Sequence, residues 1–159
     1  MTTTTPTKVT TKWDSKKIAE TTSHLVAGTW LAAFEVLSKL DKKAVEEFHK
    51  LTTQHKLSFY KNLNIKTPME LVRAIAEHDH NLFGSEIEIS GDENKATLKY
   101  NTCGVWQASE KLGAKNFSPE QQKLMGDQCA QSWNTIAKEF GFNFEPKMTQ
   151  DSYEMTFSK

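Results

Sequence analysis

The sequence predicts a single α+β domain: a helical N-terminal half, then a four-stranded antiparallel sheet with one long helix packed on it. Three observations support this prediction. From residue 14 to about residue 80, apolar side chains recur every three or four positions, which is typical of amphipathic helices. In two later segments the period changes to two, as expected for strands with one buried face. Between those segments, residues 118–141 return to helical spacing.

Length and composition fit one domain behind a short tail. The 159 residues are enough to bury a core without disulfides or metals. Residues 1–12 are rich in threonine and lack an apolar stretch, so we expect a disordered tail rather than a secretory signal. No repeat or linker divides residues 13–159, which we expect to form the single domain.

Charge and hydropathy argue against two classes of partner. Twenty basic and twenty acidic residues cancel, whereas nucleic-acid-binding proteins usually carry a basic excess. No apolar run approaches the roughly 18 residues that a membrane span needs. We therefore expect a cytoplasmic protein that binds neither nucleic acid nor membrane. In that reducing compartment, Cys103 and Cys129 are free thiols or ligands rather than a disulfide.

Capping residues set the boundaries of the first helices. Asp14 and Asp41 are good N-caps for helices that run to about residue 39 and about residue 63. A third helix begins at Thr67-Pro68-Met69-Glu70, where the threonine caps, the proline fills the first turn and the glutamate completes a capping box. We expect this helix to fray near His80.

Apolar stripes indicate how these helices pack. On the second helix, Phe48, Leu51, His55 and Phe59 share a face, which predicts that this face is buried. The first helix carries more apolar positions than one packing face needs. These positions are Ile18, Leu25, Val26, Trp30, Leu31, Phe34 and Leu37. An exposed remainder of that stripe would favour a homodimer formed through the first helices.

The second half predicts two hairpins around the long helix. The first hairpin begins at Phe83, turns at residues 90–94 and ends near residue 102. A short helix over residues 104–112 follows, and Ser118-Pro119-Glu120-Gln121 is a second capping box that opens the long helix. After Gly141, alternation resumes in two strands separated by a turn at residues 149–152.

Two cysteines mark the candidate site. Cys103 ends the second strand, with Trp106 three residues later, and Cys129 lies four residues before Trp133 on the same face of the long helix. If that helix crosses the sheet, the two thiols approach each other near the end of the second strand, and Tyr100 is a further candidate ligand-binding residue. Such a pocket suits a small organic ligand or a soft metal. The alternative is that both cysteines pack as small core hydrophobes.

The segment Glu77-His78-Asp79-His80 is a second cluster, at the end of the third helix. Imidazole and thiolate groups bind zinc and its neighbours, so His78 or His80 with Cys103 would form a site for a divalent transition metal such as zinc or iron. Cys129 is the further candidate ligand. For catalysis, Cys103 would be the nucleophile and His78 the base, because histidine titrates near neutral pH. Histidines near a helix C-terminus are also favoured by the helix dipole alone.

The second half resembles a known family. Leu98-Lys99-Tyr100-Asn101-Thr102-Cys103, the helical Cys129 and residues 150–157 are similar to elements of the L-2-amino-thiazoline-4-carboxylate hydrolase family, and more distantly to the 4-vinyl reductase ligand-binding domain. The resemblance covers about residues 70–159 and implies the fold and a pocket containing Cys103 and Cys129. Gly104 replaces the family's usual proline, and the family's cysteine in the closing strand is missing here. The resemblance therefore implies no particular substrate.

Three functions remain open at this point. We favour a non-catalytic module that binds a small molecule or metal in a pocket around the two cysteines, because no complete acid–base pair can be assigned. The first alternative is a metal- or thiol-dependent hydrolase acting on a small C–N bonded substrate. The second alternative is a homodimeric interaction protein whose cysteines are structural. The sequence lacks a Gly-rich phosphate loop and a Gly-x-Ser-x-Gly elbow, which argues against nucleotide enzymes and serine hydrolases of that type.

Overall fold

The computed structural model describes residues 13–148 and 152–159. The predicted tail over residues 1–12 and most of the predicted last turn, residues 149–151, lie outside the described residues. Three helices come first, α1 (Ser15–Leu40), α2 (Lys42–Lys61) and α3 (Pro68–Phe83). The remaining elements are β1 (Glu86–Gly91), β2 (Lys95–Thr102), α4 (Gly104–Lys111), the 3-10 helix η1 (Ala114–Asn116), α5 (Pro119–Glu139), β3 (Asn143–Met148) and β4 (Tyr153–Ser158).

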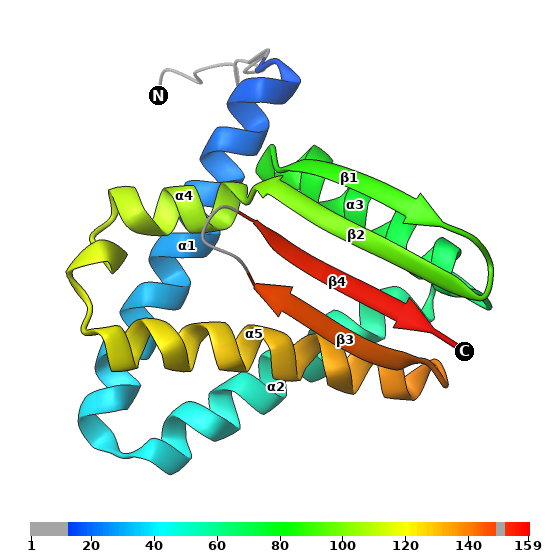
Figure 1. The fold of residues 1–159 in the computed structure, drawn as a ribbon. Coiled ribbons are helices and arrows are strands. Elements are labelled where there is room, and N and C mark those ends of the chain that lie inside the picture. Colours follow the sequence, from blue (N-terminus) through cyan, green and yellow to red (C-terminus); the bar gives the residue numbers. More distant parts are fainter. Residues whose placement is uncertain (1–12, 149–151) are drawn as a thin grey trace, which may run out of the picture.

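The four strands form one antiparallel sheet in the order β1-β2-β4-β3, so the α+β prediction is confirmed (Figure 1). Strand alternation gives the sheet two different faces. On β2, Ala96, Leu98 and Tyr100 are buried in the main core, whereas Thr97 lies between them and hydrogen-bonds Thr156 of β4 at 2.9 Å. One face therefore packs under helices while the other stays polar.

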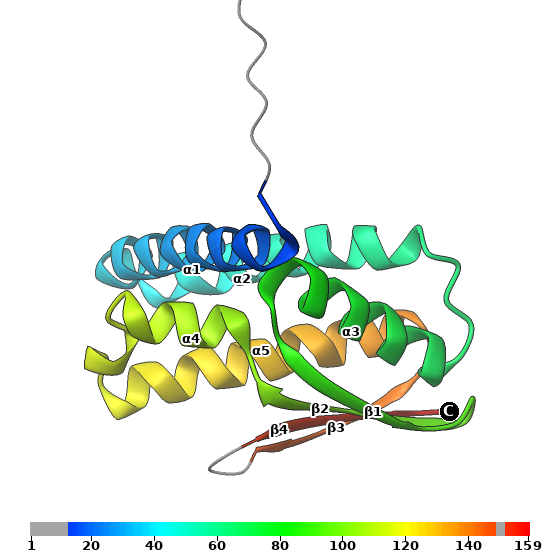
Figure 2. The same ribbon diagram turned by 90° about the horizontal axis from the view of Figure 1, so that it is seen from above.

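All helices lie on one side of the sheet (Figure 2). Helices α3 and α5 pack directly on it, and α1 and α2 form the layer farthest from it (Figure 2). The main core lies between the sheet, α3 and α5. A second core of Leu31, Phe34, Val45, Ala114 and Met125 joins the helices to one another. Within the described part of the chain, no helix has both the length and the apolar character that a bilayer span requires.

Both predicted capping boxes are present. In the first, the amide of Glu70 donates to the Thr67 hydroxyl at 3.2 Å, and the Glu70 carboxylate accepts from the amide of Thr67 at 3.0 Å. In the second, Ser118 and Gln121 exchange the same pair of bonds at 3.3 and 2.9 Å. These bonds satisfy amides that a helix start leaves without partners, which is why the local sequence fixes both starts.

The predicted end of the third helix near His80 is wrong, as is the start of the first strand at Phe83. Helix α3 continues to Phe83 because Gly84 ends it in the left-handed conformation, with φ of 64°. The amide of Gly84 then donates to the carbonyl of His80 at 2.9 Å, and that of Ser85 donates to the carbonyl of Asp79 at 3.2 Å. The Glu77–His80 cluster therefore lies within the helix, before its last residues, rather than at its fraying end.

The buried face of α2 also differs from the prediction. Its buried residues are Val45, Thr53 and Tyr60, whereas Leu51 and Phe59 are exposed, as is the histidine between them. The hydroxyl of Thr53 hydrogen-bonds that of Ser132 on α5 at 3.0 Å, so this side of α2 faces the core. Leu51 and Phe59 share a helical stripe, but that stripe is not the one that packs.

Candidate functional site

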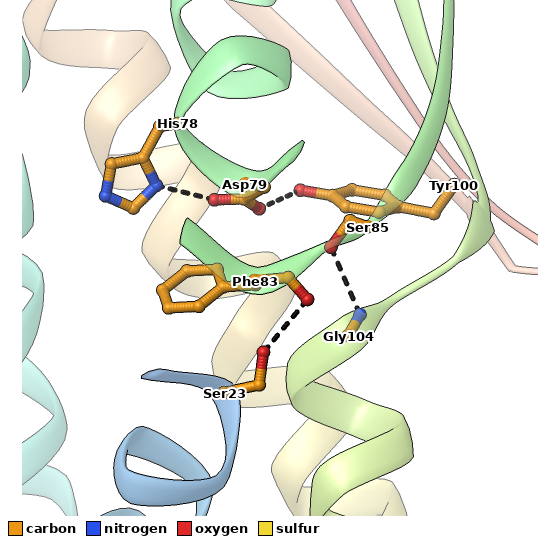
Figure 3. A network of polar contacts seen from close by, with 7 residues as sticks. All are labelled: Ser23, His78, Asp79, Phe83, Ser85, Tyr100 and Gly104. Atoms are coloured by element: carbon orange, nitrogen blue, oxygen red, sulfur yellow. Dashed lines mark hydrogen bonds and ion pairs between the residues drawn. The ribbon is translucent and has the colours of Figure 1, made fainter. Parts of the chain in front are cut away.

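The chain is clamped where β2 passes into α4. Ser85 accepts a hydrogen bond from the amide of Gly104 at 3.1 Å, and the hydroxyl of Ser23 donates to the carbonyl of Phe83 at 2.9 Å (Figure 3). A Cβ atom at Gly104 would lie 1.7 Å from the carbonyl oxygen of Phe83, so only glycine fits. This close approach of three elements fixes the position of Cys103, the residue just before Gly104.

A partly buried carboxylate lies beside this junction. Asp79 of α3 accepts a hydrogen bond from the hydroxyl of Tyr100, which is only 7% exposed on β2 (Figure 3). The other carboxylate oxygen contacts Nδ1 of His78 at 2.7 Å. An ionised carboxylate only accepts hydrogen bonds, so the imidazole carries its proton on Nδ1 towards Asp79. The His78 ring is held between Phe59 and Phe83, with centroid distances of 5.2 and 5.4 Å.

Burial and the charge of Asp79 keep the neighbouring phenols protonated. Burial is the larger cause that raises the pKa of Tyr100 and of Tyr60, and the nearby Asp79 carboxylate raises both further. Both phenols therefore stay neutral at physiological pH. Tyr100 donates the hydrogen bond that accommodates Asp79 beside the core, where an unpaired carboxylate would be costly.

The Cys103 thiol is protonated at neutral pH. Burial raises its pKa to about 11, and the charges of Asp79 and Cys129 act in the same direction. The amides of Trp106 and Val105, at the start of α4, favour the thiolate but do not outweigh burial. At pH 7 a thiol with this pKa is ionised in only about one molecule in 10,000. Cys103 is therefore poorly suited to act as a nucleophile in this state.

Cys129 of α5 has an exposed side chain. The protein atoms packed around its sulfur are nonetheless the largest cause that raises the pKa of its thiol. Lys56 lowers this pKa and Asp79 raises it, and the Trp133 side chain favours the thiolate. We call the surroundings of the Cys129 sulfur, which include Lys56 and Trp133, the Cys129 recess.

Tyr153 contributes a hydroxyl without a partner. It lies opposite Tyr100 in the β2–β4 register, and the two rings stack with centroids 6.4 Å apart. Burial, followed by the charge of Cys129, raises the pKa of the Tyr153 phenol. Its oxygen is buried and, among the described residues, has no hydrogen-bond partner. Such a group costs about 1–3 kcal/mol unless a ligand or water satisfies it.

The structure brings some of the predicted site residues together. Cys103 and Cys129 are unpaired thiols, the charge of Cys129 acts on the pKa of Cys103, and both lie within electrostatic reach of Asp79. Trp133 is buried against Tyr60 at a centroid distance of 5.8 Å. Trp106, on α4, is instead exposed.

The predicted metal ligands are not assembled into a metal site. His78 is directed to Asp79, and Nδ1 of His80 donates to the carbonyl of Ser85 at 3.0 Å. Among the described residues, no group of three or more His, Cys, Asp or Glu side chains is placed to hold a metal ion. These residues do not fit a zinc or iron site, so no metal enters the chemistry proposed below.

Sequence reasoning missed the importance of Asp79, Tyr153 and Lys56. Asp79 stands in the predicted cluster, but the histidines drew attention as possible metal ligands. Its role depends on Tyr100, which is 21 positions away on a different element. Lys56 places its ammonium 4.5 Å from the centroid of Trp133 and acts electrostatically on Cys129. Lys56 lies on an exposed part of α2, and nothing in the sequence indicated its contact with Trp133.

A separate hollow of about 240 Å³ lies away from the thiols, between α1 and the α4–η1 turn. Its lining residues are Gly28, Leu31, Ala32, Glu35, Leu112, Gly113 and Phe117. This lining offers one carboxylate at an exposed position and no thiol, phenol or imidazole. It therefore lacks the convergent polar groups that characterise a ligand site.

Comparison with known proteins adds no assignment. No family model and no curated protein matches the chain. The resemblance to the L-2-amino-thiazoline-4-carboxylate hydrolase family therefore stays a prediction, and the function must be argued from the site itself.

Proposed function

We propose that this protein is a non-catalytic small-molecule-binding module whose ligand occupies the Cys129 recess. The observation that carries the proposal is the buried hydroxyl of Tyr153, which has no hydrogen-bond partner among the described residues and lies within electrostatic reach of the exposed Cys129 thiol. A polar group of this kind beside apolar side chains is what a small-molecule site uses to orient its ligand. The ligand would be a small organic molecule in contact with the thiol.

The chemistry around the recess supports an organic ligand. The stacked rings of Tyr100 and Tyr153 and the indole of Trp133 make the surroundings aromatic, and the hydroxyl of Tyr153 is a donor with no partner among the described residues. Pockets for small molecules are mostly apolar, with a few polar groups that fix orientation. A ligand with an aromatic or unsaturated body and one hydrogen-bond acceptor matches this surface.

The protonation state of the site argues for binding rather than turnover. The thiol of Cys103 has a pKa of about 11 and lacks the adjacent base that would activate it. The candidate base, His78, directs Nδ1 to Asp79, which leaves Nε2 as its accepting nitrogen. Nucleophile and base must be within hydrogen-bond reach of each other, and among the described residues no hydrogen bond joins His78 to Cys103.

Fragment binding observed by NMR tests the proposal. We expect fragments from a library of small aromatic compounds to shift the ring signals of Tyr153 and the indole signals of Trp133. The Cys129→Phe variant fills the recess and should abolish these shifts. The Ile89→Phe variant adds similar bulk at an exposed position on β1 and should retain them. Fragments that bind Cys129→Phe as well as wild type would contradict a site at Cys129.

A further inference from the structure

Helix α1 has two apolar faces, and only one of them packs against this chain. The inward face is formed by Ala19, Ser23, Ala27, Leu31 and Phe34, all buried. On the opposite face, Ile18 is 43% exposed, Leu25 is 63% exposed and Val36 is 59% exposed. Residues 18, 25 and 36 are separated by whole turns, so they align on one side of the helix. The predicted stripe of the first helix is thus divided between core and surface.

The exposed face has the spacing of a helix–helix seam. Alternating steps of four and three residues define the seam positions of paired helices. From Ile18 such steps lead through two threonines, Leu25 and an alanine to Val36. The full series is Ile18, Thr22, Leu25, Thr29, Ala32 and Val36. A surface helix with a single partner needs only one stripe, so a second regular seam indicates a second partner.

We propose that the seam packs against the same seam of a second copy of this chain, with the two α1 helices antiparallel. Helix α1 lies in the layer farthest from the sheet, where another molecule can approach it (Figure 2). A twofold axis near Ala27 would place Ile18 opposite the partner's Val36, and Leu25 opposite the partner's Thr29. The same surface then serves both copies, as a twofold interface requires.

Charge complementarity favours a second copy and fixes the orientation. Lys17 and Glu35 flank the seam on the same side, because five turns of helix separate them. In the antiparallel arrangement Lys17 would lie near the partner's Glu35, and the twofold axis repeats this contact. A parallel arrangement would instead place Lys17 and Glu35 on the opposite flank of the seam from the same residues of the partner, so this contact between unlike charges would be lost. Opposite charges that meet in only one orientation favour that orientation.

The size of the seam sets the expected strength. A helix of 26 residues is about 39 Å long and, with side chains, about 10–12 Å wide. Two such faces would bury on the order of 1,000 Å² in total, near the lower limit for specific interfaces. We therefore expect a reversible dimer with a dissociation constant in the micromolar range, independent of any ligand at Cys129.

Sedimentation equilibrium of the full chain, from about 1 to 500 µM, tests the proposal. Wild type should pass from monomer to dimer in that range. The Leu25→Glu variant should weaken association at least about tenfold, because it buries charge at the centre of the seam. The matched control, Ile89→Glu, places the same charge at an exposed position on the sheet and should associate like wild type. Circular dichroism verifies that each variant is folded.

Charge reversal tests the orientation in the same assay. Lys17→Glu and Glu35→Lys should each weaken association, and the double variant should restore it towards wild type. A wild-type chain that stays monomeric throughout, or a Leu25→Glu variant that dimerises like wild type, would overturn the seam. A double variant no stronger than the two single variants would overturn the antiparallel pairing.

Discussion

The hydroxyl of Tyr100 donates a hydrogen bond to the carboxylate of Asp79, which ties the centre of the sheet to the last turns of α3. The contact lies beside the two thiols, and the charge of Asp79 raises the pKa of both. Burial is the larger cause of both raised pKa values, and the Asp79 carboxylate adds to it while its bond to Tyr100 joins the sheet to the helix. Fold stability and the chemical state of the site therefore both depend in part on Asp79.

Replacing Tyr100 by phenylalanine should lower the free energy of unfolding by about 1–3 kcal/mol, because a buried acceptor loses its donor. The Tyr153→Phe variant is the matched control, since that phenol has no hydrogen-bond partner among the described residues. Its removal should leave stability unchanged or raise it by up to about 1 kcal/mol. Urea denaturation at pH 7 measures both. Equal losses in the two variants would show that the Asp79 contact has no special role.

Alanine substitution at two glycines should change stability in opposite directions, because only one of them is in tight surroundings. At Gly104 the new Cβ would lie 1.7 Å from the Phe83 carbonyl oxygen, so we expect a loss above about 3 kcal/mol or no folded protein. At Gly28, in mid-helix, it would meet Leu112 at an ordinary 3.6 Å. Gly28→Ala should stabilise the protein by about 0.5–1 kcal/mol through its higher helix propensity. Thermal melts compare the stability of the two variants with that of wild type. A destabilised Gly28→Ala variant would show that the contact between α1 and Leu112 is too tight for a Cβ atom.

Stability should fall as the pH rises above 9, in part through Cys103. Its pKa is about 11 in the folded chain against an ordinary 9.0, so the unfolded state ionises first. The contribution of the protonated Cys103 thiol to the free energy of unfolding is therefore complete below pH 9 and is lost as the pH approaches 11. It amounts to about 2–3 kcal/mol. Urea denaturation at about pH 8, 9, 10 and 11 measures the free energy of unfolding across this range. It should fall less steeply with pH for Cys103→Ala than for wild type. Identical declines would mean that the Cys103 thiol is not desolvated.

The sequence predicts those parts of the fold that local chemistry controls. Thr67 with Glu70 and Ser118 with Gln121 set helix starts through contacts three residues apart, and both were found. Period-two alternation likewise located the hairpins. The end of α3 was missed because it depends on the backbone conformation of Gly84, a residue that also suits a loop.

Features that depend on distant partners were not predictable. The apolar stripe of α2 is as regular as a buried one, but Thr53 and Tyr60 take the inward position because they meet α5 and α3. For the site, the sequence singled out the two cysteines, and the charges of both act on the pKa of Tyr100. It could not show that the Asp79 carboxylate would lie beside Tyr100, because that requires the packing of α3 on β2.

Native mass spectrometry of untagged chain, purified without chelator, tests small-molecule binding at the thiols most directly. We expect wild type to carry the added mass of one organic molecule per chain, with metal analysis of the same sample showing no stoichiometric metal. The Cys103→Ala, Cys129→Ala double variant should lack that mass while remaining folded. A bare wild-type chain, stoichiometric metal, or the same added mass on the double variant would contradict an organic-ligand site at the Cys129 recess.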